Sequence, residues 1–556
     1  MLTSAQPPRD REFIERGEMI GEVRSPFEAV ERTALTWGER DALHIPVTAC
    51  ADYAAQPITY SYAELYEAVL SASAQWSGAA VCGRIALVLE NRPEFFIHWL
   101  ALNALGISVI PLNHELRDEE IPYYLEHGGA VALVCLEKHF ARMSRICGGL
   151  SDSIPCVTPD GISSLALGGE SLDKRYDHDL ECALLYTSGS TGKPKGCILS
   201  NDYFVQQGIW YRRLGGHISL QPGRERLLTP LPLSHMNAMS VSTMAMFMTA
   251  GCLVQLDRFH PSTWWQSVRD SDATALHYLG VLPAILLALP ESDRDSVAPQ
   301  VRFGFGAGVN PAHHDRFEKR FGFPLVEAWA MTECGAGGAI IAADEPRHVG
   351  ECCFGKPSQA IDWQIVDDSG LPVDKGQPGE LRVRAAGKDP KKGFFSGYLS
   401  DPEATEEVWQ SGWLNTGDVV SEMADGSLVF VDRKKNIIRR SGENISALEV
   451  EAVASAHAAI KDVIATSVAD DFRGEEVALC VVLKDDTQCG TEVARLIQQH
   501  VMQNLAYFKS PGWVVFVEEM PVTASNKPRR AEIKRMAASA VTSGAAHDLR
   551  TLKVRQ

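Results

Sequence analysis

The chain has 556 residues, of which 45% are hydrophobic and 22% are charged, and its formal net charge is −18. This length predicts two or more domains, and the ordinary composition excludes a disordered, collagen-like or coiled-coil protein. The acidic balance argues against binding to a phosphate backbone, so we expect no nucleic-acid partner, although local loops and helix dipoles can still bind a nucleotide.

The cysteines and the apolar segments indicate where the protein resides. The 13 cysteines follow no repeated spacing, so zinc sites are not predicted and free thiols in a reducing compartment are expected. Residues 1–16 are polar and lack the apolar core of a signal peptide. The most apolar stretch, residues 236–256, contains Asn237, Gly251 and Gln255, and we interpret it as a buried helix followed by a strand. We therefore expect a cytoplasmic protein without stable membrane insertion.

Strand-like and helix-like segments alternate in the first half of the chain. The pattern predicts buried strands over residues 84–89, 106–111 and 130–135, with helices over residues 93–105 and 119–126. Such alternation is typical of α/β layers built on parallel sheets. From residue 355 to residue 434, short strands alternate with Gly, Asp and Pro turns, which indicates a small β-rich subdomain.

The end of the chain has a different pattern. We predict helices over residues 447–455 and 492–505, and strands over residues 462–469, 476–483 and 512–517. This pattern is sufficient for a separate α+β domain. The expected architecture is therefore a large N-terminal domain of layered α/β subdomains, residues 1–434, whose β-rich part spans about 355–434, followed by an α+β C-terminal domain, residues 435–556.

A loop dense in Gly, Ser and Thr follows a predicted buried strand. Glycines let backbone N–H groups face an anion, hydroxyls can donate to phosphate oxygens, and lysines add positive charge. The alternative is a flexible linker, but linkers seldom separate a buried strand from an apolar run such as Cys197-Ile-Leu. A Walker A loop is excluded because Pro194 follows Lys193. The loop reads Thr187-Ser188-Gly189-Ser190-Thr191-Gly192-Lys193-Pro194-Lys195-Gly196.

This loop resembles the signature of the adenylate-forming (AMP-binding) superfamily, which includes acyl- and aryl-CoA synthetases, peptide-synthetase adenylation domains and firefly luciferase. Residues 232–290 resemble the crotonobetaine/carnitine-CoA ligase-like branch. The chain departs from the family pattern at Ser234, Trp329 and Asn526, where an aromatic residue, Tyr and Gly are usual. Further segments are similar to other family motifs in the family's order: 230–235, 305–308, 328–333, 413–418, 432–438, 441–445, 449–451 and 521–527.

The resemblance implies an enzyme, an AMP-forming acid–thiol ligase. It would convert a small carboxylic acid and ATP into an acyl-adenylate and pyrophosphate, and then form an acyl-CoA thioester and AMP. The implied cofactors are ATP, Mg²⁺ and coenzyme A. The alternative is a stand-alone adenylation enzyme that loads the acyl group onto the pantetheine of an acyl carrier protein. The acid stays open among aromatic, aliphatic and quaternary-ammonium acids.

The resemblance also implies roles for individual residues. Catalytic roles fall on Lys527, His235, Thr187 and Glu333, and Glu333 is also the implied Mg²⁺ ligand. The C-terminal domain is expected to swing about a hinge at Lys435 between the two half-reactions. The implied nucleotide- and CoA-binding residues are Thr187, Ser188, Gly189, Ser190, Thr191, Gly192, Lys195, Gly306, Ala307, Gly308, Ala328, Trp329, Ala330, Met331, Thr332, Asp418, Arg433, Lys435, Ser441, Gly442 and Glu443.

Several of these residues also have an ordinary structural interpretation. Trp329 offers a face for adenine, yet it can equally be a core indole. Asp418 can accept both ribose hydroxyls, or it can be an Asx-turn residue after Gly417. His235 can line an acyl pocket or be a satisfied core histidine, and Lys527 can belong to a solvated basic face with Arg529 and Arg530.

Overall fold

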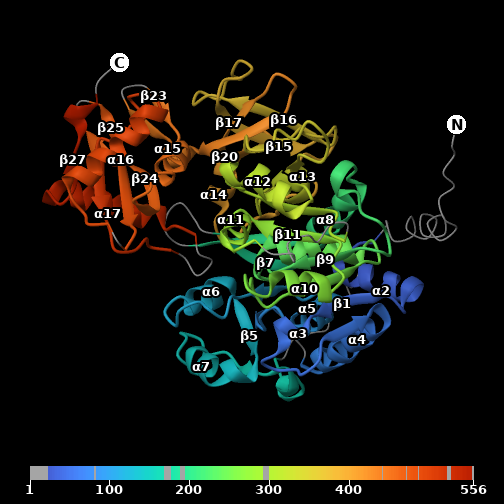
Figure 1. Ribbon diagram of the computed structural model, residues 1–556. Helices are drawn as coiled ribbons and strands as arrows, with labels where there is room; N and C mark the ends of the chain where they lie inside the picture. The colour runs from blue at the N-terminus through green and yellow to red at the C-terminus, as the bar shows by residue number, and fades with distance from the viewer. Residues whose placement is uncertain are drawn as a thin grey trace, which may run out of the picture. The chain divides into compact units, whose positions relative to one another are not determined.

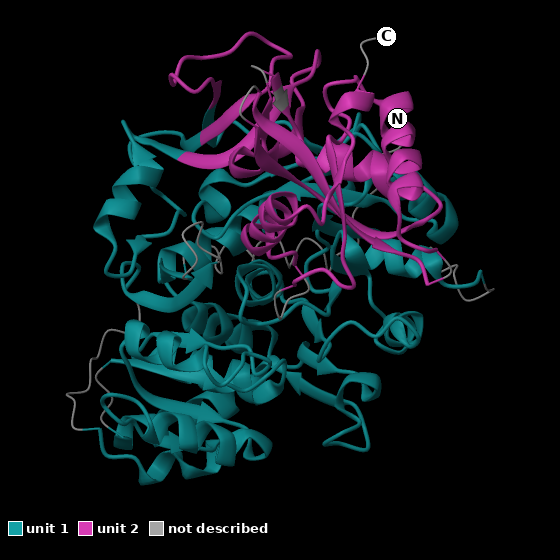
Figure 2. Cartoon of the chain, turned by 90° about the vertical axis from the view of Figure 1, so that its left-hand side faces the viewer, with its two compact units in different colours: residues 1–363, 383–414 teal, residues 364–382, 415–556 magenta. Residues whose placement is uncertain are grey.

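A computed structural model describes residues 23–79, 83–167, 177–187, 194–291, 300–440, 443–470, 473–485, 487–522 and 527–553. The chain divides into two compact units, Met1–Trp363 with Val383–Leu414, and Gln364–Arg382 with Asn415–Gln556 (Figure 2). This division does not decide where the chain hinges, so the boundary predicted after residue 434 stays a prediction.

An eight-stranded sheet lies in the first unit, with the strand order β14-β13-β12-β11-β9-β10-β1-β2. Figure 1 labels its strands β1, β9 and β11. The strands from β13 to β1 pair in parallel, and the edge strands β2 and β14 pair antiparallel. The carboxyl ends of the parallel strands therefore share one edge, where ligands of such sheets bind. Their bounds are β1 Asp41–Ile45, β2 Ile58–Ser61, β9 Arg226–Thr229, β10 Cys252–Gln255, β11 Ala275–Leu279, β12 Phe303–Ala307, β13 Leu325–Trp329 and β14 Ile340–Ile341.

A seven-stranded sheet in the same unit has the order β18-β8-β7-β4-β3-β5-β6. Strand β7 carries the chain into the Gly/Ser/Thr loop and β8 carries it out, as antiparallel neighbours that place Thr187 opposite Lys195. The short strand β18 lies beside β8 although it is far away in sequence. The bounds are β3 Arg84–Val88, β4 Val109–Pro111, β5 Ala130–Cys135, β6 Cys156–Val157, β7 Glu181–Thr187, β8 Lys195–Ser200 and β18 Gly397–Tyr398.

Local sequence signals start the helices of this unit. Ser25, Ser200, Asn310 and Asp401 each cap a helix by accepting a backbone N–H with the side chain, and proline follows three of these caps. The bounds are α2 Pro26–Trp37, α3 Val47–Cys50, α4 Tyr62–Ala79, α5 Pro93–Ala104, α6 Ile121–Gly128, α7 Glu137–Gly148, α8 Asn201–Arg213, α9 Thr243–Phe247, α10 Trp264–Asp270, α11 Val281–Ala288, α12 Pro311–Phe321, α13 Gly335–Gly338 and α14 Pro402–Val408.

The chain passes between the two units within strands β16 Ile361–Val366, β17 Gly379–Ala385 and β20 Trp413–Glu422. In one sheet these strands follow β21 Leu428–Arg433 in the order β21-β20-β17-β16. Across the antiparallel pair β20 and β21, Asp418 lies opposite Arg433. Two predicted site residues are thus neighbours through strand register alone.

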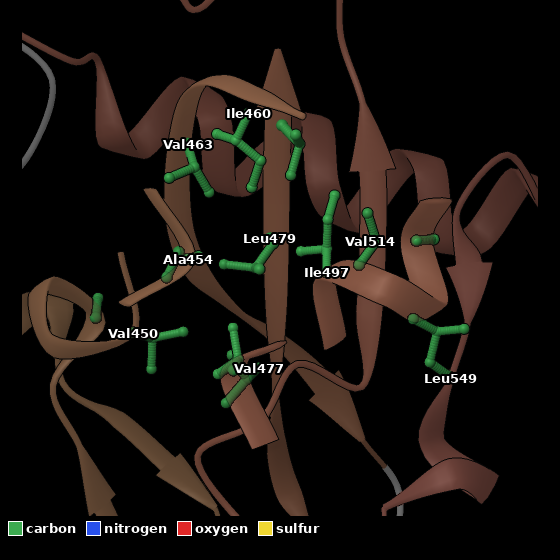
Figure 3. Close-up of a cluster of buried hydrophobic side chains, with 14 of the residues drawn as sticks. Val450, Ala454, Ile460, Val463, Val477, Leu479, Ile497, Val514 and Leu549 are labelled. Atoms are coloured by element: carbon green, nitrogen blue, oxygen red, sulfur yellow. The ribbon is translucent and has the colours of Figure 1, made fainter. Parts of the chain in front are cut away.

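The rest of the second unit is an α+β fold around the sheet β23-β22-β25-β26-β27, in which β24 also pairs with β25. Figure 3 shows part of the core on this sheet, where Val450, Ile460, Leu479, Ile497 and Val514 pack together. The bounds are β22 Ile438–Arg440, β23 Glu443–Ile445, α15 Ala447–Ser455, β24 Ile460–Asp470, β25 Gly474–Leu483, α16 Thr491–Asn504, β26 Trp513–Phe516, α17 Arg530–Ser543 and β27 His547–Asp548.

These elements confirm the predicted α/β class and most predicted segments. The helix predicted over residues 447–455 has those bounds in the structure, because Ser446 caps it by accepting the Glu449 N–H. The apolar stretch after Met236 forms a π-helical turn over Asn237–Ser242, then α9 and β10. Within the described residues, no helix combines the length and apolarity needed to cross a bilayer.

Candidate functional site

The carboxylate of Glu333 lies between the strand that enters the Gly/Ser/Thr loop and the edge strand β18. It follows β13 in a short turn, and 6% of the residue is exposed. The Tyr398 hydroxyl donates to its Oε1 at 2.8 Å, and the Thr187 hydroxyl donates to the same oxygen at 3.4 Å. Burial and the nearby Glu333 raise the pKa of Tyr398, so its hydroxyl stays a donor. Two predicted site residues, Thr187 and Glu333, are therefore in contact.

Lys195, the first residue of β8, lies over the ring of Tyr398. Its Nζ is 4.9 Å from the centre of the Tyr398 ring and 3.8 Å from a carboxylate oxygen of Asp401. The ammonium thus sits near the exit of the loop, held by a ring and an acid. The predicted loop residues Ser188, Gly189, Ser190, Thr191 and Gly192 lie outside the described residues.

Gly306 and Ala307 are the last two residues of β12, and Gly308, with a φ of 78°, turns the chain out of the strand. A Cβ on Gly306 would lie 2.4 Å from the Tyr278 carbonyl oxygen, so a side chain there is excluded. The turn is held by Glu327 of β13, whose carboxylate accepts from the N–H groups of Gly308 at 2.9 Å and Val309 at 3.2 Å. The Tyr278 hydroxyl also donates to Glu327 at 2.8 Å, and burial raises the pKa of this carboxyl.

The segment from Ala328 to Thr332 runs from β13 towards Glu333. The indole of Trp329 is 6% exposed, and its ring centre lies 6.1 Å from that of Phe354. The role of Trp329 towards adenine stays a prediction. Ala328, Met331 and Thr332 are partly exposed and Ala330 is exposed, so these residues remain accessible to a nucleotide.

His235 is partly exposed and precedes the π-helical turn by two residues. A buried network anchors this turn to strand β11. The Tyr211 hydroxyl is 3.1 Å from Nε2 of His277, and Nδ1 of His277 is 2.8 Å from the Ser242 hydroxyl and 3.0 Å from Oδ1 of Asn237. With Nδ1 protonated, His277 donates to Asn237 and accepts from Tyr211, which fixes a neutral ring.

His277 should make the stability of the protein depend on pH. Burial lowers its pKa to about 3, against 6.5 for the exposed side chain. Below pH 6.5 His277 is protonated in the unfolded chain but stays neutral in the folded protein. The stability that is present above pH 6.5 is therefore lost as the pH falls towards 3. We expect a loss of about 1.4 kcal/mol per pH unit below 6.5 from this residue.

Urea unfolding of the wild type and of His277→Gln at pH 7.5, 6.5 and 5.5 measures this contribution. The variant is less stable throughout because it disturbs the buried network, but its stability should fall less steeply below pH 6.5. Equal slopes for the two proteins would contradict the prediction.

The second unit gathers the other predicted residues around Asp418. This carboxylate is 2% exposed and forms an ion pair with Nε of Arg433 at 3.1 Å. Burial and the charge of Arg433 lower the pKa of Lys435. Lys527 is exposed, and desolvation together with the charge of Arg433 lowers its pKa too. One acid and three cations thus form a basic site.

Asp432 organises the predicted hinge region. Its buried carboxylate accepts from the N–H of Leu448 at 3.0 Å and from the Ser446 hydroxyl at 2.9 Å, both at the start of α15. It also accepts from Nδ2 of Asn436 at 3.2 Å. These bonds bracket Lys435 on both sides. Glu443 begins β23 and is exposed, and the predicted residues Ser441 and Gly442 lie outside the described part of the chain.

A buried ionic cluster includes Arg440, the last residue of β22. Nε of Arg440 donates to both oxygens of Glu476 at 2.8 and 2.9 Å, and Nζ of Lys553 donates to Oε1 at 2.6 Å. The side chains of Glu476 and Lys553 are 0% and 1% exposed. Burial lowers the pKa of Lys553 to about 8 despite the carboxylate. We call Arg440, Glu476 and Lys553 the C-terminal ionic cluster.

Sequence reasoning did not identify Tyr398, Glu327 or His277. Glu327 directly precedes the quoted motif 328–333, but Tyr398 lies outside the quoted motifs and nothing in the local pattern shows that it meets Glu333. The only local signal is that Tyr398 precedes the capped helix α14 by a few residues. His277 reads as one residue of an apolar strand, and its partners come from α8 and the π-helical turn.

The donor set around Glu333 suits a hard cation. Mg²⁺ takes oxygen ligands and is commonly held by one or two carboxylates together with phosphates and water. Glu333 supplies one carboxylate, oriented by hydroxyl donors and placed beside the loop predicted to bind phosphate. In the described residues, no three His, Cys, Asp or Glu side chains gather into a closed metal cluster. The geometry fits a cation shared with a nucleotide.

Comparison with known proteins places the chain among nucleotide-dependent enzymes. The sequence family described as AMP-binding enzyme matches residues 30–399, and the family described as AMP-binding enzyme C-terminal domain matches residues 449–527. A crotonobetaine/carnitine–CoA ligase of Escherichia coli is 27% identical over 501 residues, covering 85% of this chain and 93% of that protein.

Solved structures share the fold. An o-succinylbenzoate CoA synthetase from Bacillus subtilis, in complex with an acyl-adenylate intermediate, superposes with a TM-score of 0.78 at 23% identity, covering 91% of this chain and 97% of that one. An amide bond synthetase from Marinactinospora thermotolerans gives a TM-score of 0.75 at 23% identity, covering 92% and 99%. At this identity the likeness concerns the fold alone.

Proposed function

Because the chain belongs to the AMP-binding enzyme family, we propose that it is an ATP-dependent carboxylic acid:CoA ligase. The observation that carries the proposal is the buried Glu333, held by Tyr398 and Thr187 where the Gly/Ser/Thr loop leaves its strand. A triphosphate needs a cation, and a carboxylate held beside this loop can bind one. The relative from Escherichia coli supports coenzyme A as the acceptor.

The first half-reaction overcomes the poor electrophilicity of a carboxylate. A carboxylate oxygen of the acid attacks the α-phosphorus of ATP and forms the acyl-adenylate. The bond between the α-phosphorus and the α,β-bridging oxygen breaks, and the β and γ phosphates leave as pyrophosphate. Two anions must approach each other, so positive charge lowers the barrier. We assign this charge to Lys527 and Lys195, with Asp418 accepting the ribose hydroxyls and Arg433 beside it.

Mg²⁺, when bound, would neutralise charge on the triphosphate, and Glu333 would hold it. Thr187 and the loop N–H groups would orient the phosphates. Gly306 to Gly308, with the adjoining segment from Ala328 to Thr332, would face the adenosine. His235 would line the acyl pocket.

The second half-reaction transfers the acyl group. The thiolate sulfur of coenzyme A attacks the acyl carbon, the bond to the phosphate oxygen breaks, and AMP leaves. We propose that the C-terminal domain, residues 435–556, turns about Lys435 between the steps, so that Lys527 leaves and Ser441, Gly442 and Glu443 flank the pantetheine arm. A hinge needs a large φ/ψ change at only a few residues.

The proposal also covers the compartment, the acceptor and the acid. The protein would act in the cytoplasm, where free thiols, ATP and coenzyme A are available. The competing acceptor is the pantetheine of an acyl carrier protein, which presents the same thiol on a macromolecule. Since the relative named above acts on crotonobetaine and carnitine, quaternary-ammonium acids belong in the first substrate set, beside aromatic and aliphatic acids.

A pyrophosphate-release screen over such a carboxylic-acid library, with and without coenzyme A, tests the function. For the accepted acid we expect AMP and pyrophosphate as products and an acyl-CoA thioester by mass spectrometry. Formation of ADP and orthophosphate would refute the adenylation chemistry. Release of pyrophosphate with thioester only on a carrier protein would favour the competing acceptor.

A further inference from the structure

Tyr398 reaches Glu333 because the short strand that carries it is hydrogen-bonded into the seven-stranded sheet. Strand β18 pairs antiparallel with β8, with Tyr398 opposite Cys197. The Ser396 N–H donates to Ile198 and the Leu399 N–H donates to Gly196, each at 2.8 Å. These hydrogen bonds fix the backbone on both sides of Tyr398. The position of its side chain therefore depends on β8, the strand that leaves the loop.

The hydroxyl of Tyr398 controls the orientation of a carboxylate. It donates to Oε1 of Glu333 at 2.8 Å, and the Phe395 N–H donates to the backbone carbonyl of Glu333 at 3.0 Å. Both the main chain and the side chain of Glu333 are therefore tied to the segment that carries β18. A carboxylate fixed through one oxygen offers its second oxygen in a defined direction, as hydrogen-bonded metal ligands do.

The ring of Tyr398 acts on a second charge. The Lys195 ammonium lies 4.9 Å from the ring centre, within the range of a cation–π contact, and 3.8 Å from Asp401. Asp401 is itself fixed because it caps α14 by accepting the Ala404 N–H at 3.0 Å. One tyrosine thus contacts both the acid and the lysine that the proposed function brings to a triphosphate.

We propose that Tyr398 is a positioning residue for the metal–nucleotide complex. Its hydroxyl orients the carboxylate of Glu333, and its ring positions the ammonium of Lys195. This inference rests on the proposed function, because it assigns Glu333 to the metal and Lys195 to the phosphates. It adds a residue on β18 to a site otherwise built from β7, β8 and the turn after β13.

The test is Tyr398→Phe, which removes the hydroxyl and keeps the ring. Mn²⁺ is the probe: its binding in the presence of ATP is followed by electron paramagnetic resonance, which needs no turnover. Loss of a residue that orients a metal ligand typically weakens the metal by roughly 10- to 100-fold, so we expect at least about tenfold weaker Mn²⁺ binding. The Mg²⁺ concentration for half-maximal pyrophosphate release should rise in parallel, with the KM of the acid unchanged.

Tyr66→Phe is the matched control. The Tyr66 hydroxyl also donates to a glutamate, Oε1 of Glu31 at 2.9 Å, but it links α4 to α2. We expect this variant to bind Mn²⁺ and ATP like the wild type. Tyr398→Phe should also form thioester from a synthetic acyl-adenylate at the wild-type rate, because that step needs no triphosphate.

The outcomes separate the inference from the function. Wild-type Mn²⁺ binding in Tyr398→Phe would overturn the role of Tyr398, and so would a loss of thioester formation without a loss of Mn²⁺ binding. If the wild-type protein itself bound no Mn²⁺ with ATP and released no pyrophosphate with any acid, the proposed function would fail and the inference with it. Circular dichroism of both variants checks that they fold.

Discussion

Lys527→Ala is expected to slow acyl-adenylate formation by roughly a hundredfold or more, because it removes a preorganised positive charge at the point where two anions meet. Desolvation and the positive charge of Arg433 both lower the pKa of Lys527. In the proposed second step the lysine has moved away. Thioester formation from a synthetic acyl-adenylate should therefore stay close to the wild-type rate.

Pyrophosphate release and acyl-CoA formation, measured separately, distinguish the two half-reactions. Lys534→Ala is the control, because Lys534 is an exposed lysine of α17 that pairs only loosely with Glu475 at 3.4 Å. We expect this variant to be unchanged in both steps. Gly442→Leu should show the opposite pattern to Lys527→Ala if Gly442 flanks the pantetheine arm. Equal slowing of both steps by Lys527→Ala would refute the alternation of the C-terminal domain.

Glu476→Ala should destabilise the second unit by about 3 to 5 kcal/mol, the usual cost of removing one partner from a buried ion pair. The carboxylate is fully buried and accepts from Arg440 and Lys553. Without it, two buried cations face each other, and burial already lowers the pKa of Lys553 to about 8 in its presence. The free-energy loss comes mainly from these uncompensated charges.

Hydrogen–deuterium exchange of the full-length protein measures the loss of stability within the second unit. Amides of β24 and β25 should exchange at least about a hundredfold faster in Glu476→Ala, since their protection reports the local opening free energy. The control is Glu449→Ala, which removes a partly exposed pair with Lys509 and should cost less than about 1 kcal/mol. Similar protection in the two variants would show that the C-terminal ionic cluster contributes little.

The same cluster has a consequence for function. Arg440 is the last residue of β22 and directly precedes the segment of Ser441 and Gly442 that we assign to the pantetheine arm. Its guanidinium is held by both oxygens of Glu476. Loosening this anchor should slow the thioester step more than the adenylation step, which the two separate assays can resolve.

Much of this protein could be predicted from the sequence, because the signals are local. Helix α15 begins where Ser446 can cap it, and buried strands such as β3 and β5 follow from short apolar runs. The Gly/Ser/Thr loop and the ordered family motifs indicated the family without coordinates, and they predict the site residues. For the same reason the predicted boundaries hold to within a few residues.

The contacts between distant segments could not be predicted in this way. Tyr398 meets Glu333 across 65 positions of sequence, and this contact depends on the register of β18 against β8. His277 finds its partners on α8 and on the π-helical turn, and Lys553 finds Glu476 across 77 positions. The burial of Trp329 against Phe354 is likewise a property of packing.

The sequence by itself determined the family and the α/β class and predicts the charged residues of the site, since each of these depends on residue type and short spacing. The tertiary structure alone decided which of these charges are buried, which hydroxyl orients Glu333 and which cations share Glu476. The physical reason is that burial and pairing depend on sheet order and register, and these are fixed by the sum of many weak long-range contacts that no local pattern records.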